Sequence, residues 1–229
     1  NSRHGVLKIP NSYSIAYVID GQHRLYGFAD TDEIFKATIP VVAFENLSSD
    51  EQLGMFLDIN ENQKKIAPRL KLTLQEDINW ESPNTLSRMK ALRSGIINRL
   101  SDLVGPFRDY LSIGEETKEL SPTFIDNALR KAPGLLPKVK SNKLLNDIGI
   151  LYDLQNQDQQ NEMENTRVKI ADLINKLYIY IGENYKDLFE NKRYFIRSNR
   201  GLFAFVYVIG SLNKYLSKKN RVDITTDVD

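Results

Sequence analysis

Residues 15–25 read Ile-Ala-Tyr-Val-Ile-Asp-Gly-Gln-His-Arg-Leu. The first five, residues 15–19, form a short, β-rich apolar run, which is typical of a buried strand. Gly21 then allows a sharp turn, and residues 22–29 continue as a short helix. Residues 39–44, Ile-Pro-Val-Val-Ala-Phe, form a second short, β-rich apolar run. We therefore predict a strand, a glycine turn and a helix, followed by a second strand.

Four polar side chains follow the first predicted strand directly, from Asp20, Gln22, His23 and Arg24. The first peptide N–H groups of a helix lack intrahelical acceptors and lie at the positive end of its dipole, so they favour an anion such as phosphate. Arg24 can bind phosphate bidentately, and histidine is the one side-chain type in this cluster that can gain a proton near neutral pH. Asp20 can orient either side chain or help to bind a metal. The alternative is structural, with Asp20 paired to Arg24 and His23 solvated.

A second polar segment, residues 60–65, follows a predicted amphipathic helix over residues 51–60, for which residues 48–50 offer N-cap oxygens. The amides of Asn60 and Gln63 can contact a base edge or a ribose, and Lys64 supplies a charge for phosphate. Taken alone, such a segment is more often a solvated loop.

The composition restricts the classes of function. The chain has 229 residues, 31 Lys plus Arg, 30 Asp plus Glu, two His and no Cys. A disulfide framework, a thiolate zinc site and a cysteine nucleophile are excluded, and no metal centre is predicted. The net charge of +1 means that any site for nucleic acid must be a local cluster.

One such basic cluster, around residues 64–71, includes Lys65, Arg69 and Lys71, which we assign to DNA contact; the alternative is a solvated face. No apolar run reaches the length of a membrane span, and nothing suggests export, so we expect a cytoplasmic protein without a membrane partner.

After Pro68 helical periodicity replaces the strand pattern, and we place the domain boundary after residue 75. A helix over residues 166–183 is predicted from one apolar stripe. Another is predicted over residues 201–216, capped by Asn199, and it is apolar on nearly every face, so we expect nearly every face to be covered. Core packing explains most of the aromatic residues between 178 and 207; a base-stacking platform is the alternative.

The motif Asp20-Gly21-Gln22-His23-Arg24, with Phe56-x-x-Ile59-Asn60-x-x-Gln63-Lys64-x-Ile66 downstream, resembles the DGQHR-domain family, which includes DndB-like proteins of DNA phosphorothioation systems. The similarity is close over residues 15–70 and loose beyond. The family is similar to ParB and sulfiredoxin-like proteins. It implies an α+β fold: a small mixed-sheet core over residues 1–75, followed by a mainly α-helical domain over residues 76–229.

The resemblance also implies roles for individual residues. Gly21, Gln22, His23 and Arg24 would hold nucleotide phosphates, with Asn60, Gln63 and Lys64 facing them. Asp20, His23 and Arg24 are the candidate catalytic residues for an NTPase that uses a nucleoside triphosphate with Mg²⁺. ParB proteins carry a Glu-Asn-x-Gln-Arg box where this chain has Asn60-Glu61-Asn62-Gln63-Lys64. The loss of the first carboxylate argues against ParB-style metal-dependent hydrolysis.

Three functions follow as expectations. The first is a nucleotide-binding component of a bacterial or archaeal DNA modification or defence system, whose helical part senses DNA or partner proteins. The second is a non-enzymatic, DNA-binding transcriptional regulator of such a system, in which the same turn clamps the DNA backbone. A ParB-like nuclease comes last, because it needs several acidic ligands around a metal and Asp20 with Asp58 or Glu61 provides few.

Overall fold

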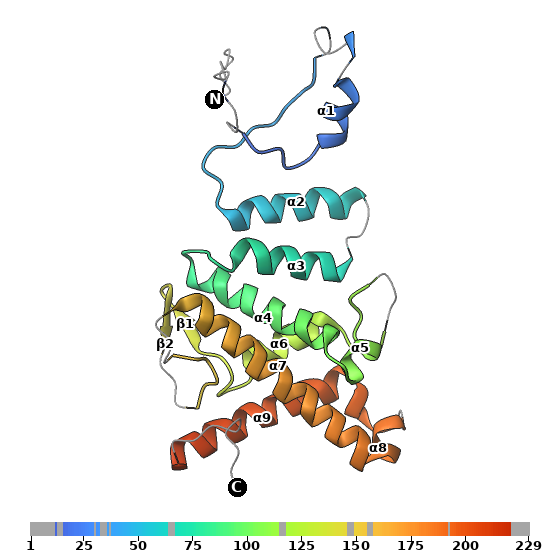
Figure 1. Cartoon of the computed structure of the whole chain (residues 1–229), viewed down its shortest axis with the longest axis vertical. Coiled ribbons are helices and arrows are strands. Elements are labelled where there is room, and N and C mark those ends of the chain that lie inside the picture. The colour runs from blue at the N-terminus through green and yellow to red at the C-terminus, as the bar shows by residue number, and fades with distance from the viewer. Residues whose placement is uncertain are drawn as a thin grey trace. The chain divides into compact units, whose positions relative to one another are not determined.

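The computed structural model describes residues 12, 16–29, 31–32, 36, 38–63, 67–114, 118–145, 149–154, 158–191 and 193–220. The chain divides into two compact units, residues 1–63 and 64–229 (Figure 1). Most of the described residues are helical, and one small antiparallel sheet places the chain in the broad α+β class. The division after Gln63 differs from the boundary predicted after residue 75, which falls inside a helix.

The first unit contains two described helices, α1 (Gln22–Phe28) and α2 (Ser49–Gln63). The helix predicted directly after Gly21 is therefore confirmed. The two predicted strands are wrong over the described residues: 16–19 and 38–44 form no strand, and Val41, Val42 and Phe44 are exposed, while Ile15 of the first prediction lies outside the described residues. A strand forms only where a neighbouring strand accepts and donates its backbone hydrogen bonds, and none is paired with these segments in the described part of the unit.

The start of α2 is a capping box. The Ser48 hydroxyl accepts from the Glu51 N–H at 3.3 Å, and the Glu51 carboxylate accepts from the Ser48 N–H at 2.8 Å. This reciprocal pair satisfies amides that the first helical turn leaves without acceptors. The N-cap predicted for residues 48–50 is thereby confirmed at Ser48.

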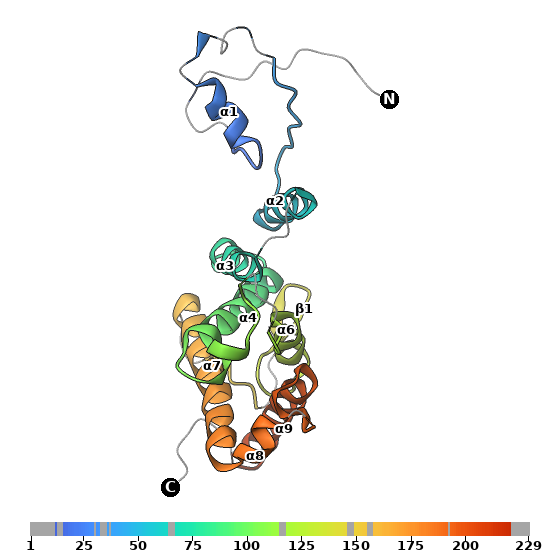
Figure 2. The same cartoon turned by 90° about the vertical axis from the view of Figure 1, so that its right-hand side faces the viewer.

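The second unit is built around one hydrophobic core that extends from Leu72 to Ile209. Its longer helices are α3 (Pro68–Asn79), α4 (Thr85–Asp102), α6 (Pro122–Lys131), α7 (Gln159–Asn184) and α9 (Asn199–Asn220). Helix α4 packs between α3 and α7, and α6 packs on α9 (Figures 1 and 2). The short helices α5 (Pro106–Tyr110), α8 (Lys186–Glu190) and the 3₁₀ helix η2 (Phe195–Arg197) connect them.

Helix α7 confirms and extends the predicted helix over residues 166–183. Ala171, Ile174, Tyr178 and Ile181 of the predicted stripe are buried. The helix begins earlier, at Gln159, because the Asp158 carboxylate accepts from the Gln160 N–H at 3.0 Å and caps a polar first turn.

A β-hairpin interrupts the helical unit, although no strand was predicted there. Strands β1 (Lys138–Lys140) and β2 (Lys143–Leu145) pair through a turn in which Ser141 and Asn142 have φ angles of 49° and 59°. Two successive positive φ angles are the geometry of a type I′ turn, which matches the twist of paired strands. The Asn142 carbonyl accepts from the Thr85 hydroxyl at 2.7 Å, which ties the turn to the start of α4.

Helix α9 contains the predicted helix over residues 201–216, but two predictions about it are wrong. Its cap is Ser198, whose hydroxyl accepts from the Gly201 N–H at 3.1 Å, while the Asn199 side chain accepts instead from the Ser121 N–H at 2.8 Å. Nor is every face covered. An apolar face of α9 is exposed because α6 and η2 pack only on its other sides; its residues are Ala204, Tyr207, Val208, Leu212 and Tyr215.

Within the part of the chain that the structure describes, the longest and most apolar helices still fall short of what a membrane span requires.

Candidate functional site

The turn before α1 has the backbone geometry expected of a glycine turn. Gly21 adopts φ 94° and ψ 10°, in the left-handed region, and its carbonyl accepts from the N–H groups of Arg24 at 3.0 Å and Leu25 at 3.1 Å. A Cβ added at Gly21 would meet no atom within 4 Å among the described residues. Glycine is therefore required by the backbone angle, and the space around it leaves room for a ligand to approach the chain.

The side chains of the turn are arranged around α1 and are mostly solvent-accessible. The Asp20 carboxylate lies 4.0 Å from the Arg24 guanidinium, whose side chain is 69% exposed. The Gln22 side-chain amide donates to the Val18 carbonyl at 3.2 Å, which bridges the turn. His23 is exposed. The loose ion pair between Asp20 and Arg24 is the structural alternative that the sequence left open, and it coexists with an exposed guanidinium.

The second polar segment is described only in part. Asn60 and Gln63 lie in the last turns of α2, although their side chains fall outside what the structure describes, as does all of Lys64. Helices α1 and α2 are not among the element pairs that pack extensively, and α1 has no buried residue. The convergence of these residues on residues 21–24 therefore stays a prediction.

The residues assigned to DNA contact lie at the start of α3, in the second unit. Arg69 donates to the Asp102 carboxylate at 2.8 Å, and both side chains are more than half exposed. Lys71 is half-buried on the same helix, and Lys65 lies outside the described residues. Because Asp102 already compensates Arg69, this cluster is a weaker attraction for a phosphate backbone than the sequence alone indicates.

A metal centre finds no support in the described ranges, where no three His, Asp or Glu side chains gather closely enough to hold an ion. At the turn Asp20 is the single carboxylate of the motif, and it faces Arg24.

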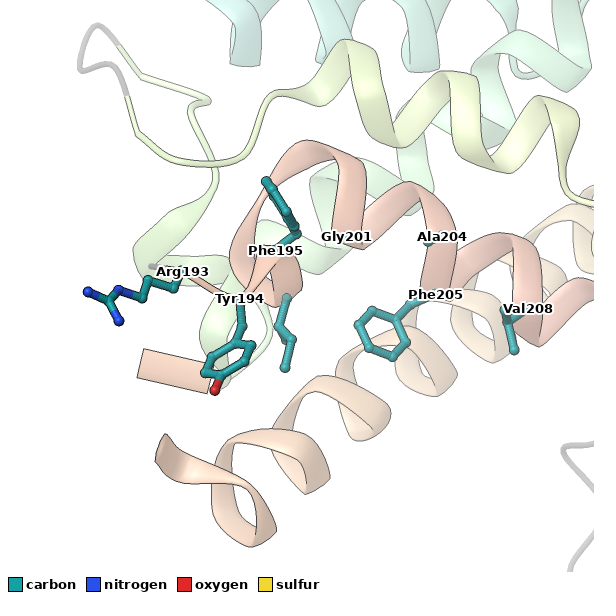
Figure 3. Close-up of a pocket in the computed structure, with 8 residues that line it drawn as sticks. Arg193, Tyr194, Phe195, Gly201, Ala204, Phe205 and Val208 are labelled. Carbon is teal, nitrogen blue, oxygen red and sulfur yellow. The ribbon is translucent and has the colours of Figure 1, made fainter. Parts of the chain in front are cut away.

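Sequence reasoning missed an apolar pocket of about 510 Å³ in the second unit, between η2 and the first turns of α9. The side chains of Tyr194, Phe205 and Val208 lie along one side of α9 there, and Arg193 lies at the rim (Figure 3). Core packing, predicted for most of the aromatic residues between 178 and 207, is confirmed for Phe205, which packs partly buried against the core, whereas Tyr194 is 50% exposed. One signal in the sequence marks this region: residues 191–222 contain no Asp or Glu, and Lys and Arg flank the uncharged run 201–213 on both sides.

Comparison with family models, with curated proteins and with solved structures gives no match to this chain.

Proposed function

We propose that this chain is a DGQHR-domain component of a bacterial or archaeal DNA modification or defence system, which binds a nucleoside triphosphate at the turn of residues 20–24. The observation that carries the proposal is the left-handed, uncrowded Gly21 directly before a helix whose first turn bears exposed His23 and Arg24. The proposal includes a ParB-like mixed-sheet core around the turn. The turn and α1 support such a core, whereas the described residues of the first unit contain no strand.

Arg24 is the residue on which binding depends most. Its pair with Asp20 is long, at 4.0 Å, and largely solvated, so exchanging the carboxylate for a phosphate costs at most about 1 kcal/mol. A phosphate then receives the planar guanidinium fork together with the first N–H groups of α1. Gln22, held by its hydrogen bond to the Val18 carbonyl, keeps the turn in place.

Magnesium would enter with the nucleotide. The phosphate oxygens would supply most of its ligands, with Asp20 as the one acidic side chain of the motif near enough to contribute, either directly or through water. Hydrolysis requires stabilisation of charge on the leaving phosphate, and Arg24 is the group of the turn that could provide it.

The test is a calorimetric titration of the whole chain with ATP and GTP in the presence of magnesium. We expect Arg24→Ala to weaken binding at least tenfold, because the bidentate contact is lost. Arg130→Ala, which removes an exposed arginine of α6, is the matched control and should bind as the wild type does. Equal affinities for the wild type and Arg24→Ala would overturn the assignment.

Salt dependence separates nucleotide binding from the DNA-clamping alternative. A turn that grips duplex DNA releases several counterions, so its affinity for DNA falls steeply between 50 and 200 mM salt. Binding of DNA at low salt that is abolished by Arg24→Ala, with no nucleotide binding at all, would favour the regulator over the nucleotide-binding component.

A further inference from the structure

The proposed function does not use the exposed apolar face of α9. Tyr207, Val208, Leu212 and Tyr215 are each between 45% and 60% exposed, and Ala204 is exposed beside them. With 3.6 residues per turn, these five positions fall on one side of the helix. We call them the α9 face. Several large apolar side chains gathered on one helix mark an interaction surface.

The α9 face continues into the pocket at its N-terminal end. Ala204 and Val208 belong to the face and also line the cavity of about 510 Å³ between η2 and α9, where the ring of Phe205 lies between Tyr194 and Val208 (Figure 3). A cavity of this size takes a large apolar side chain, which is how a protein interface is usually anchored. The surface therefore combines an exposed apolar helix face with a pocket that can hold a side chain of a partner.

Positive charge borders the α9 face at both ends. Arg200 is exposed one turn before Ala204, and Lys218 and Lys219 are exposed at the last turn of α9. Arg193 adds a cation at the rim of the pocket. Residues 191–222 contain no acidic residue, so these cations have no acidic neighbour within the helix itself.

This charge pattern selects the kind of partner. If two copies of the chain paired through their α9 faces, Arg200 of one copy would face either Arg200 or Lys218 and Lys219 of the other, so the ends would repel. Nucleic acid would satisfy the charges, and Tyr207 and Tyr215 offer rings, but the centre of the face between them consists of Ala204, Val208 and Leu212, on which a base cannot stack. A partner with an apolar stripe and acidic ends would bury the apolar centre of the face and pair with the cations at its ends.

We propose that the α9 face binds an amphipathic helix of a partner protein, with an apolar stripe flanked by acidic residues. Arg200 and Lys219 lie beyond the two ends of the α9 face, and the helix extends about 28 Å between them at 1.5 Å per residue. This length corresponds to about five turns of a partner helix. Docking an apolar helix face into a groove is an established mode of recognition. This proposal is independent of nucleotide binding at Gly21.

The test uses a labelled synthetic peptide of twenty residues with Leu at positions i, i+4, i+7 and i+11 and Glu at both ends, and fluorescence anisotropy as the readout. The whole chain should bind it at least tenfold more tightly than the same peptide with Lys in place of Glu. Val208→Asp should weaken the binding at least tenfold. Val104→Asp, at an 81% exposed valine in the connection between α4 and α5, should leave it unchanged.

A second variant tests the charges separately from the apolar centre. Arg200→Glu should weaken binding of the peptide with Glu ends and strengthen binding of the peptide with Lys ends. It should leave the helix intact, because an acidic residue is favourable in the first turn of α9. Thermal unfolding of each variant serves as the control for folding.

Four results would overturn the proposal: equal affinity for the two peptides, equal loss in Val208→Asp and Val104→Asp, displacement of the acidic peptide by a single-stranded oligonucleotide at the same face, or a dimer of the chain that Val208→Asp dissociates.

Discussion

Asn213 shows how a single buried side chain joins distant segments of the second unit. It is fully buried in α9, and its NH₂ group donates to the carbonyl oxygens of Gly134, at 2.6 Å, and Gly149. Both glycines have left-handed φ angles, of 73° and 83°. A Cβ at Gly149 would collide with the backbone of Lys214, so the loop approaches α9 this closely only because glycine stands there.

We expect Asn213→Asp to destabilise the second unit by about 2–3 kcal/mol, because a buried carboxylate oxygen would replace the NH₂ group and face the two carbonyl oxygens that this group now donates to. Urea unfolding followed by circular dichroism measures the change. Asn184→Asp is the matched control: its amide also donates to a carbonyl, of Tyr180 at 2.9 Å, but in an exposed position. Asn184→Asp should lower the free energy of unfolding by less than about 0.5 kcal/mol. Equal decreases in the two variants would contradict this account.

At the scale of elements, helix α2 depends on a charge at its first turn. Hydrogen bonds from the Ser48 backbone N–H and then from the Ser48 hydroxyl hold the pKa of Glu51 below its ordinary value. Since the pKa in the folded chain lies below that in the unfolded chain, the carboxylate stabilises the helix above the unfolded pKa. This stabilisation is lost as the pH falls through the folded pKa.

We therefore expect the start of α2 to fray on acidification, and Ser48→Ala to move the pKa of Glu51 part of the way back towards its ordinary value. The measurement is an NMR titration of the Glu51 carboxyl carbon, with the urea-unfolded chain as the reference. If Glu51 titrates at the same pH in the folded and unfolded chains, the capping box does not form in solution.

At the scale of the whole molecule, the main hydrophobic core belongs to one unit. Its described members extend from Leu72 to Ile209, and all of them follow the division after Gln63. The first unit contributes few buried apolar residues by comparison, among them Leu53 and Leu57 of α2. A segment that buries its own core can fold alone, because burial of apolar area is the main term opposing the loss of chain entropy.

We expect the fragment 64–229 to fold cooperatively by itself, with a melting temperature within about 4 °C of that of the whole chain, the shift that ~1 kcal/mol produces at this size. Differential scanning calorimetry of the fragment and of the whole chain provides the comparison. A fragment that unfolds without a cooperative transition would show that residues 1–63 are needed for the core.

The sequence by itself determined the features whose causes are local. The N-cap among residues 48–50, the stripe of α7 and the sharp turn at Gly21 each depend on residues within one or two helical turns, so spacing and residue type are sufficient to predict them. The reciprocal bond between Ser48 and Glu51 and the left-handed angle of Gly21 are findings of the structure. The side chains that would complete the candidate site, Asn60 and Gln63, could not be predicted in the same way, because their convergence depends on how separate helices pack.

Only the tertiary structure decided which apolar residues are covered. Residues 39–44 have the composition of a strand but no paired neighbour among the described residues. Helix α9 has the composition of a buried helix but keeps one face exposed. The physical reason is the same for both. Backbone pairing and burial are properties of two segments in contact, and the second segment is distant in the chain, so no local pattern contains it.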